Sequence, residues 1–256
     1  MIIDEIKEAV SKDFISKNTR QDGRNFLQYR DITVTKNIIP NAEGSALAQI
    51  GDTKVYAGVK IDLATPYADK PDEGIIVVNS ELSPIAHFKF ESGPPTEESI
   101  ELARVVDRGL RSSGAVDFKK LFLEEEKVLS VYVDLAVVDH SGDLIDCSYL
   151  AAMAALKSTM VPKYEDGKLL HDERPNKLEI LNDVVCTSFE KISGKLLIDA
   201  TDDEELASSG RVSFASCDDS HFCAGQKSGS AGFTVKEMDS MMDLALEQRK
   251  LLVSKL

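Results

Sequence analysis

The stretch Val137-Val138-Asp139-His140-Ser141-Gly142-Asp143-Leu144-Ile145-Asp146 leads from a strand toward a helix and decides the fold class of the chain. Residues 128–138 are rich in β-branched side chains, which favour a buried strand, and Ser141-Gly142 predicts a turn. The segment Tyr149–Leu156 that follows has many small side chains and predicts a helix. Small side chains allow close backbone approach, so we expect this helix in the middle of an α/β (α+β) molecule.

On the N-terminal side of this stretch the sequence predicts further helices and strands. Thr96 and the two glutamates after it predict a helix start, and the apolar periodicity extends that helix to about Ser113. Two apolar runs, 46–50 and 55–59, are separated by Gly51-Asp52-Thr53 and predict a hairpin. Ile6, Val10 and Phe14 are spaced for a short amphipathic helix.

The C-terminal part of the chain repeats this order of elements. Hairpins are expected over 184–198 and 212–225, and a closing helix over 234–255. Laid without gaps, residues 44–60 match residues 211–227 in the sequence of small and polar positions. We therefore predict duplicated strand–strand–helix units that share a central layer.

The duplication implies a single domain, residues 1–256, built from two halves. The first half is expected over 20–162 and the second over 178–256. Residues 163–177 are polar and contain Gly167 and Pro175, which predicts a linker.

Composition restricts the classes of function. With 43% hydrophobic and 29% charged residues among 256, the chain is typical of a folded globular protein. Its apolar runs are too short for a membrane span, and its start lacks the pattern of a secretory signal, so we expect a cytoplasmic protein. A net charge of −14 disfavours a protein that binds nucleic acid phosphates by itself, because neutralising phosphates needs Lys and Arg. Any RNA contact must then use a local basic patch or a basic partner.

Cysteines and histidines do not form a recognisable metal motif. No two cysteines have C-x-x-C spacing, and the neighbouring His221 and Cys223 fit alternating positions on a strand better than a ligand cluster. We predict no metal site, no cofactor and no catalytic group in this chain.

Three arginines lie on one face of the predicted helix at 97–113. At about 100° per residue, Arg104, Arg108 and Arg111 fall within roughly 60° of one another. Guanidinium groups suit phosphate because they donate two parallel hydrogen bonds and keep their charge. The other interpretation is a solvated face balanced by Glu101 and Asp107.

Several motifs together resemble the RNase PH superfamily, and within it the catalytically silent RNase PH-type subunits of the archaeal exosome. The resemblance covers nearly the whole chain. It rests on the opening stretch and on the following segments: Arg20-Gln21-Asp22-Gly23-Arg24, Glu81-Leu82-Ser83-Pro84, Glu101-Leu102-Ala103-Arg104-Val105-Val106-Asp107-Arg108-Gly109-Leu110-Arg111, and Gln226-Lys227-Ser228-Gly229.

This resemblance implies duplicated ββαβα units of the RNase PH type, a fold shared with domain 2 of a ribosomal protein. It also implies a ring of three heterodimers with a catalytic RNase PH-type paralogue. RNA would thread through the central channel and be cut from its 3′ end by phosphate, with possible RNA-binding cap proteins as further partners. No DNA or membrane partner is implied. The arginines at 104, 108 and 111 become the expected RNA-binding residues.

Three departures from active relatives imply that this chain is not itself a nuclease. The turn that binds the attacking phosphate, Gly-Gly-Ser/Thr-Arg in active relatives, reads Ser141-Gly142-Asp143-Leu144 here. Arg211 stands where a general acid Asp is needed. Residues 94–98 replace a pair of arginines with Pro-Pro-Thr-Glu-Glu. We therefore expect a non-catalytic ring subunit; the alternative is a phosphorolytic exoribonuclease active in its own right as a homo-oligomer.

Overall fold

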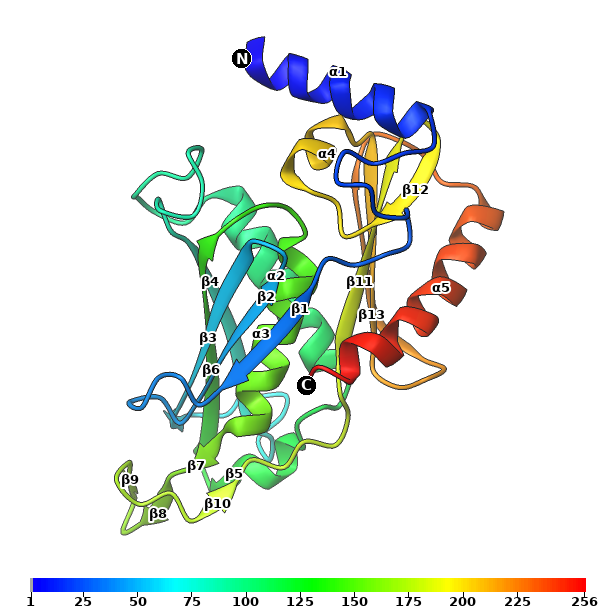
Figure 1. Ribbon diagram of the computed structural model, residues 1–256. Coiled ribbons are helices and arrows are strands. Elements are labelled where there is room, and N and C mark those ends of the chain that lie inside the picture. The colour runs from blue at the N-terminus through cyan, green and yellow to red at the C-terminus, as the bar shows by residue number, and fades with distance from the viewer. Residues whose placement is uncertain (1) are drawn as a thin grey trace.

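The computed structural model describes residues 2–256 and contains two main β-sheets with a helix between them (Figure 1). The first sheet has the strand order β1-β2-β3-β6-β4, with the short β5 paired to β6. Its strands are β1 (Ile32–Lys36), β2 (Gly44–Ile50), β3 (Thr53–Ala64), β4 (Ile75–Leu82), β5 (Phe122–Glu124) and β6 (Lys127–Asp139). Only β4 and β6 pair in parallel, as expected for strands connected by a crossover helix.

The second sheet is antiparallel and has the order β12-β11-β13-β14. Its strands are β11 (Val185–Ile192), β12 (Lys195–Ile198), β13 (Gly210–Ser216) and β14 (Phe222–Gly229). Both sheets contribute to one large core, so the two halves are not independent folding units in their packing.

The helices cover the sheets and fill the space between them. They are α1 (Ile2–Ser16), α2 (Glu97–Ser112), the 3-10 turn η1 (Phe118–Leu121), α3 (Leu144–Ser158), α4 (Asp202–Ala207) and α5 (Val235–Val253). Every residue of α3 from Leu144 to Leu156 is buried, and α3 contacts strands of both sheets. Its small side chains allow this close approach, which confirms the prediction of a central helix.

The α3 helix begins five residues earlier than the sequence indicated. Asp146 interrupts the apolar pattern, but its carboxylate accepts hydrogen bonds from Tyr29 Oη (2.7 Å) and from Ser188 Oγ (2.7 Å) and N (3.0 Å). A buried polar side chain satisfied in this way can lie inside a helix. The predicted mixed α/β fold class is confirmed.

The two halves repeat the order of elements, but the gapless superposition of their hairpins is wrong in register. In the first hairpin Ala46 pairs with Ala57. The residue that gapless superposition places over Ala46 is Ser213, and it pairs with Gln226, two positions beyond the expected Ala224. The turn of the second hairpin is longer, 217–221 against 51–52, which shifts the pairing.

Residues 163–177, predicted as a linker, connect the two halves and contain short strands. They are β8 (Lys163–Glu165) and β9 (Lys168–Leu170), which form a hairpin, and β10 (Asn176–Lys177), which pairs with β7 (Met160–Val161).

The N-terminal segment ties the first half to the second through buried ion pairs. Arg20 bonds to Glu204 of α4 (2.6 Å), while Arg24 and Arg30 both bond to Asp199 (2.7 and 2.6 Å). Arg20 and the two acidic side chains are almost wholly buried, so each charge depends on its partner. This segment follows α1 and holds that helix at the end of the molecule shown at the top of Figure 1.

Candidate nucleic-acid interface

The α2 helix presents one buried face and one exposed face, as the periodicity predicted. Thr96 caps its start by accepting a hydrogen bond from the amide of Ser99, and Glu97 and Glu98 lie in its first turn. The buried face of α2 includes five residues spaced along one side of the helix: Ser99, Leu102, Ala103, Val106 and Leu110. The exposed face therefore has a fixed orientation relative to the sheets.

The three arginines Arg104, Arg108 and Arg111 are all exposed on α2, but they are not equivalent. Arg111 forms an ion pair with Asp107 (3.0 Å) and donates a hydrogen bond to the carbonyl oxygen of Ile76 (2.8 Å). Within residues 2–256, the side chains of Arg104 and Arg108 form no hydrogen bond and no ion pair. These two guanidinium groups therefore keep all their donors for an external acceptor.

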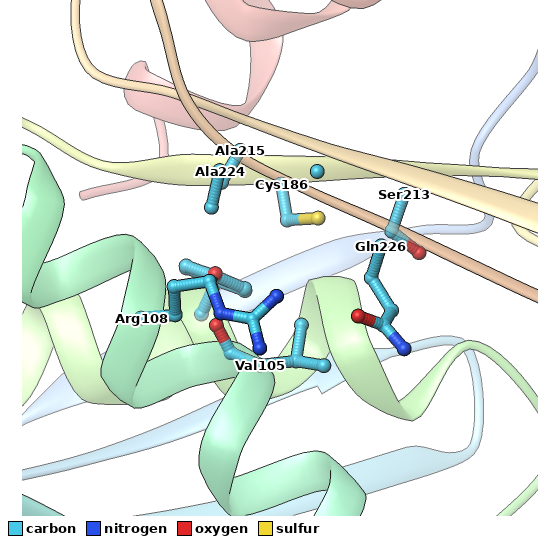
Figure 2. A pocket seen from close by; sticks show the side chains of 9 residues that line it. Val105, Arg108, Cys186, Ser213, Ala215, Ala224 and Gln226 are labelled. Atoms are coloured by element: carbon cyan, nitrogen blue, oxygen red, sulfur yellow. The ribbon is translucent and has the colours of Figure 1, made fainter.

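A narrow slot separates α2 from the second sheet beneath Arg108. Figure 2 shows the guanidinium of Arg108 beside this slot, with Gln226 and Ser213 on the opposite side. The volume inside the slot is about 10 Å³, enough for at most one water molecule. A nucleotide cannot enter it, so RNA contact at Arg108 must take place on the outer surface.

The position of α2 against α3 depends on Gly109. A Cβ atom at this position would lie 2.1 Å from the hydroxyl oxygen of Tyr149. The Tyr149 hydroxyl in turn donates a hydrogen bond to the carbonyl oxygen of Val105 (2.6 Å). Because Val105 and Gly109 directly follow Arg104 and Arg108 in the helix, these contacts fix the position of the part of α2 that carries both arginines.

The turn at 141–144 matches the phosphate-binding turn that the family resemblance implies, and three of its four amides are engaged within this chain. The amides of its first three residues donate to acceptors of the protein: Ser141 to Thr53 Oγ1 (3.0 Å), Gly142 to His140 Nδ1 (3.3 Å) and Asp143 to Glu205 Oε1 (2.8 Å). These three amides are therefore not free to bind an anion. Leu144, at the position of the family's arginine, is buried.

Asp143 adds a buried carboxyl group to the same turn. It adopts a left-handed conformation (φ 56°), and its Oδ2 has no hydrogen-bond partner within residues 2–256. Burial, together with the nearby carboxyls of Asp146 and Asp199, raises the pKa of Asp143 well above its usual value. The turn therefore contains a buried carboxyl group whose charged form is disfavoured by its surroundings.

Arg211 lies on β13 beside Glu190 of β11, its partner in the strand register. Its Nε is buried without a hydrogen bond to any residue of 2–256, and the ion pair with Glu190 is long, at 3.8 Å. It lines a cavity of about 40 Å³ together with Glu98, Glu101, His140, Glu205 and four apolar side chains. That volume is far below the roughly 300 Å³ of a typical small-molecule site, so the cavity is too small for a nucleotide.

Buried carboxyl groups surround Arg211, a feature that the sequence analysis missed. Burial, with the nearby Glu205 carboxyl, raises the pKa of Glu190 to about 8. Burial also raises the pKa of Glu205, and that of Asp146 to about 6. The only signal in the sequence was that Asp146 and Glu190 each interrupt a segment with several apolar residues.

Two observations bear on metal and membrane binding. Among residues 2–256, no group of three or more His, Cys, Asp or Glu side chains is arranged to hold a metal ion. No helix in the same range is both long and apolar enough to cross a bilayer.

Comparison with known proteins places this geometry in a family. The model of domain 1 of the 3′ exoribonuclease family (RNase PH) matches residues 28–162, and the model of domain 2 matches residues 183–248. The chain is 43% identical to the exosome complex component Rrp42 of Methanosarcina acetivorans, over 95% of this chain and 92% of that protein. It is 38% identical to the component of the same name in Thermococcus onnurineus, over 94% and 92%.

Solved structures agree with these matches. The chain superposes with a TM-score of 0.92 and 39% identity on a chain of the Archaeoglobus fulgidus exosome with RNA bound to the active site, covering 100% of this chain and 99% of that one. A chain of an archaeal exosome core gives 0.88 and 38%, covering 99% and 98%. A chain of rice Rrp46, at 20% identity, shares the fold. Two matched domains, full-length relatives and the observed two-sheet architecture together establish that the chain belongs to the RNase PH family of 3′ exoribonucleases.

Proposed function

We propose that this chain is a non-catalytic ring subunit of an exosome, a phosphorolytic 3′-to-5′ exoribonuclease complex. In this proposal it contributes RNA contacts and structures the active site of a catalytic RNase PH-type partner. The observation that carries the proposal is the contrast between two sites of the same chain. The phosphate turn at 141–144 is filled by the protein's own groups, whereas Arg104 and Arg108 keep free guanidinium groups on the surface.

Loss of catalysis follows from the chemistry of the former site. Phosphorolysis needs an anion site for the attacking phosphate and an acid to protonate the leaving oxygen. Here the anion site contains the carboxyl of Asp143 and an amide bonded to Glu205, and the position of the acid is taken by Arg211. Glu190 has a raised pKa, but it is buried and cannot reach a substrate.

RNA contact is proposed for Arg104 and Arg108, with Arg111 as a further candidate. Exposed guanidiniums without a partner can bind phosphate at no cost in broken ion pairs, whereas Arg111 must first leave Asp107. The relatives carry the name of an exosome component, and one matched structure holds RNA at an active site, which supports this assignment.

The net charge supports a partner that brings basic surface. At −14 the chain repels polyanions, so two free arginines cannot hold RNA strongly without basic surface from a neighbour. We propose a heterodimer with a catalytic RNase PH-type subunit and a closed ring of three such pairs, since closed cyclic symmetry is the usual outcome for repeated interfaces. Cap proteins that bind RNA are possible additional partners.

The proposal is tested by mixing the purified chain with the RNase PH-type subunit of the same organism. Sedimentation is expected to show a particle of roughly six times the mass of either chain. Phosphate-dependent release of nucleoside diphosphates should be strong only in that particle. Two non-interacting species, or a homo-oligomer of this chain that degrades RNA by itself, would instead favour the alternative of an independently active exoribonuclease.

A further inference from the structure

A pocket lies at the C-terminal end of α2, where the last of the three arginines meets the loop between β3 and β4. Its volume is about 320 Å³, within the range of about 300–1,000 Å³ that holds small organic ligands. Its lining includes two aromatic side chains, two cations and two carboxylates: Tyr67, Phe118, Lys70, Arg111, Asp69 and Glu73. Unlike the slot beneath Arg108, this pocket has room for a whole ring.

The loop that forms the pocket is held in place by its own backbone. The amide of Lys70 donates a hydrogen bond to the carbonyl oxygen of Tyr67 (3.0 Å), and the amide of Glu73 donates to that of Lys70 (3.3 Å). The loop therefore consists of two consecutive turns. Directly after them, the amide of Gly74 donates to the carbonyl oxygen of Phe118 in η1 (2.8 Å), which joins the loop to the opposite wall. The pocket is thus formed by the fold itself and needs no ligand to shape it.

Tyr67 and Arg111 give the pocket two flat groups that can stack on a ligand. The side chain of Tyr67 is 52% exposed and forms no hydrogen bond or ring contact within residues 2–256. The bonds of Arg111 to Asp107 and to the carbonyl oxygen of Ile76 hold its guanidinium in place. These bonds use N–H groups at the edge of the guanidinium, so its flat faces stay available for stacking.

The charges of the lining favour a neutral, flat ligand. The two cations are balanced by Asp69 and Glu73, and Lys70 forms an ion pair with Glu73 (2.7 Å). A lining without net charge attracts a phosphate group only weakly, whereas an aromatic ring and an arginine both suit the π face of a nucleobase.

The pocket also continues the row of arginines on α2. Arg111 lies three residues after Arg108, a rise of about 4.5 Å along the helix axis. A strand whose phosphates contact Arg104 and Arg108 can therefore place a neighbouring base in the pocket.

We propose that this pocket is a nucleobase subsite, in which Tyr67 and Arg111 stack on a base of the RNA strand that the other two arginines of α2 bind. The inference rests on the proposed function. Aromatic side chains beside a positively charged track hold single strands without sequence preference, because every base has a π face. Arg111 then acts through its flat face, while the unpaired Arg104 and Arg108 bind phosphates.

The test is the dissociation constant of assembled particles for a single-stranded oligoadenylate, measured in phosphate-free buffer so that the RNA is not degraded. Tyr67→Ala and Tyr67→Leu should each weaken binding at least about fivefold, the low end of the loss for one stacked base. Tyr67→Phe keeps the ring and should bind within about twofold of the wild type. The slope of log affinity against log salt should be the same in all these particles, because no phosphate contact is lost.

Two controls separate base stacking from other contacts. An abasic strand of the same length should bind equally to wild-type and Tyr67→Ala particles, because it has no base to stack. Phe88→Ala removes another exposed aromatic side chain (64%) from the loop before α2, at the other end of that helix from Arg111. It should leave the dissociation constant for oligoadenylate within about twofold of the wild type.

Sedimentation of every variant checks that the particle is intact. Wild-type affinity of Tyr67→Ala for oligoadenylate, or an equal loss of affinity for the abasic strand, would overturn the inference and leave the proposed function intact. Dissociation of the Tyr67→Ala particle would also overturn it, because the pocket would then be filled by a neighbouring protein. Failure of wild-type particles to bind oligoadenylate would instead reject the proposed function.

Discussion

Arg104 and Arg108 differ from Arg111 in that no group within residues 2–256 engages them. Three arginines at helical spacing look identical in the sequence. The structure separates them because only Arg111 comes within reach of both Asp107 and the edge strand β4, where it donates to the carbonyl of Ile76. The spacing of charged residues thus predicts which face of a helix they lie on, but not which of them are already paired within the protein.

This difference predicts a salt dependence. In assembled particles, Arg104→Ala/Arg108→Ala should flatten the slope of log affinity for single-stranded RNA against log salt by about 1.4, since each lost phosphate contact is worth about 0.7. Arg111→Ala is the matched control and should change the slope by less, because its guanidinium is already paired. Equal slopes for the wild type and the double variant, with assembly intact, would show that the two arginines are only solvated.

Glu190 predicts a pH dependence of stability. Burial, with the Glu205 carboxyl nearby, raises its folded-state pKa to about 8, above the ordinary value of 4.5, and the charged groups around it are Arg211, Glu205 and Asp146. Its stabilising contribution is therefore complete below about pH 4.5 and is lost as the pH rises through 8. Glu190→Gln should stay neutral throughout and gain on the order of 1–3 kcal/mol over the wild type between pH 6 and 9.

The comparison is made by denaturant unfolding of both proteins at several pH values. The difference in unfolding free energy between Glu190→Gln and the wild type should grow with pH across this window. A constant difference would mean that Glu190 is ionised in the folded protein at neutral pH.

At the scale of elements, the sequence predicted most of the structure because local signals agreed with tertiary packing. The cap at Thr96, the apolar periodicity of α2 and the β-branched run of β6 each had a structural counterpart with boundaries shifted by only a residue or two. The start of α3 was missed because the run of small side chains that indicated the helix begins at Tyr149, five residues after the helix does, and the buried Asp146 is satisfied by distant partners. Its partners Tyr29 and Ser188 lie 117 and 42 residues away in the chain, and no local pattern reveals them.

The candidate site was also predictable only in part, because local motifs identify its residues but not their distant partners. The residues of the turn at 141–144 and of the arginine face could be identified from motifs. The occupation of the turn's amides depends on Thr53 and Glu205, which fold topology brings to it from 88 and 62 residues away.

The contact between α2 and α3 predicts a strong effect at Gly109. Gly109→Ala would place a Cβ atom against the Tyr149 ring and should lower the unfolding free energy by about 1–3 kcal/mol through overpacking. Gly58→Ala is the control, since a Cβ atom there would have no neighbour within 4 Å. Chemical denaturation of the three proteins measures this, and equal stability of Gly109→Ala and the wild type would contradict the packing described for α2.

At the scale of the whole molecule, an acidic protein of the RNase PH family has an exposed arginine face and a turn at 141–144 whose first three amides are bonded within the chain. The N-terminal segment joins the two halves through buried ion pairs, and α1 presents apolar surface beyond them. These features fit a subunit whose fold serves assembly and RNA positioning, while a partner supplies the reacting groups.

The most direct measurement of this division of labour is phosphate-dependent release of nucleoside diphosphates from RNA by particles with one inactivated subunit type. The wild-type chain is assembled with a partner whose general acid has been removed, and compared with particles that contain an active partner. We predict activity with the active partner and none with the inactivated one, because the amides of residues 141–143 and the side chain of Arg211 leave this chain without a phosphate site or an acid. Phosphorolysis by the particle with the inactivated partner, at a rate above that of buffer alone, would contradict the account.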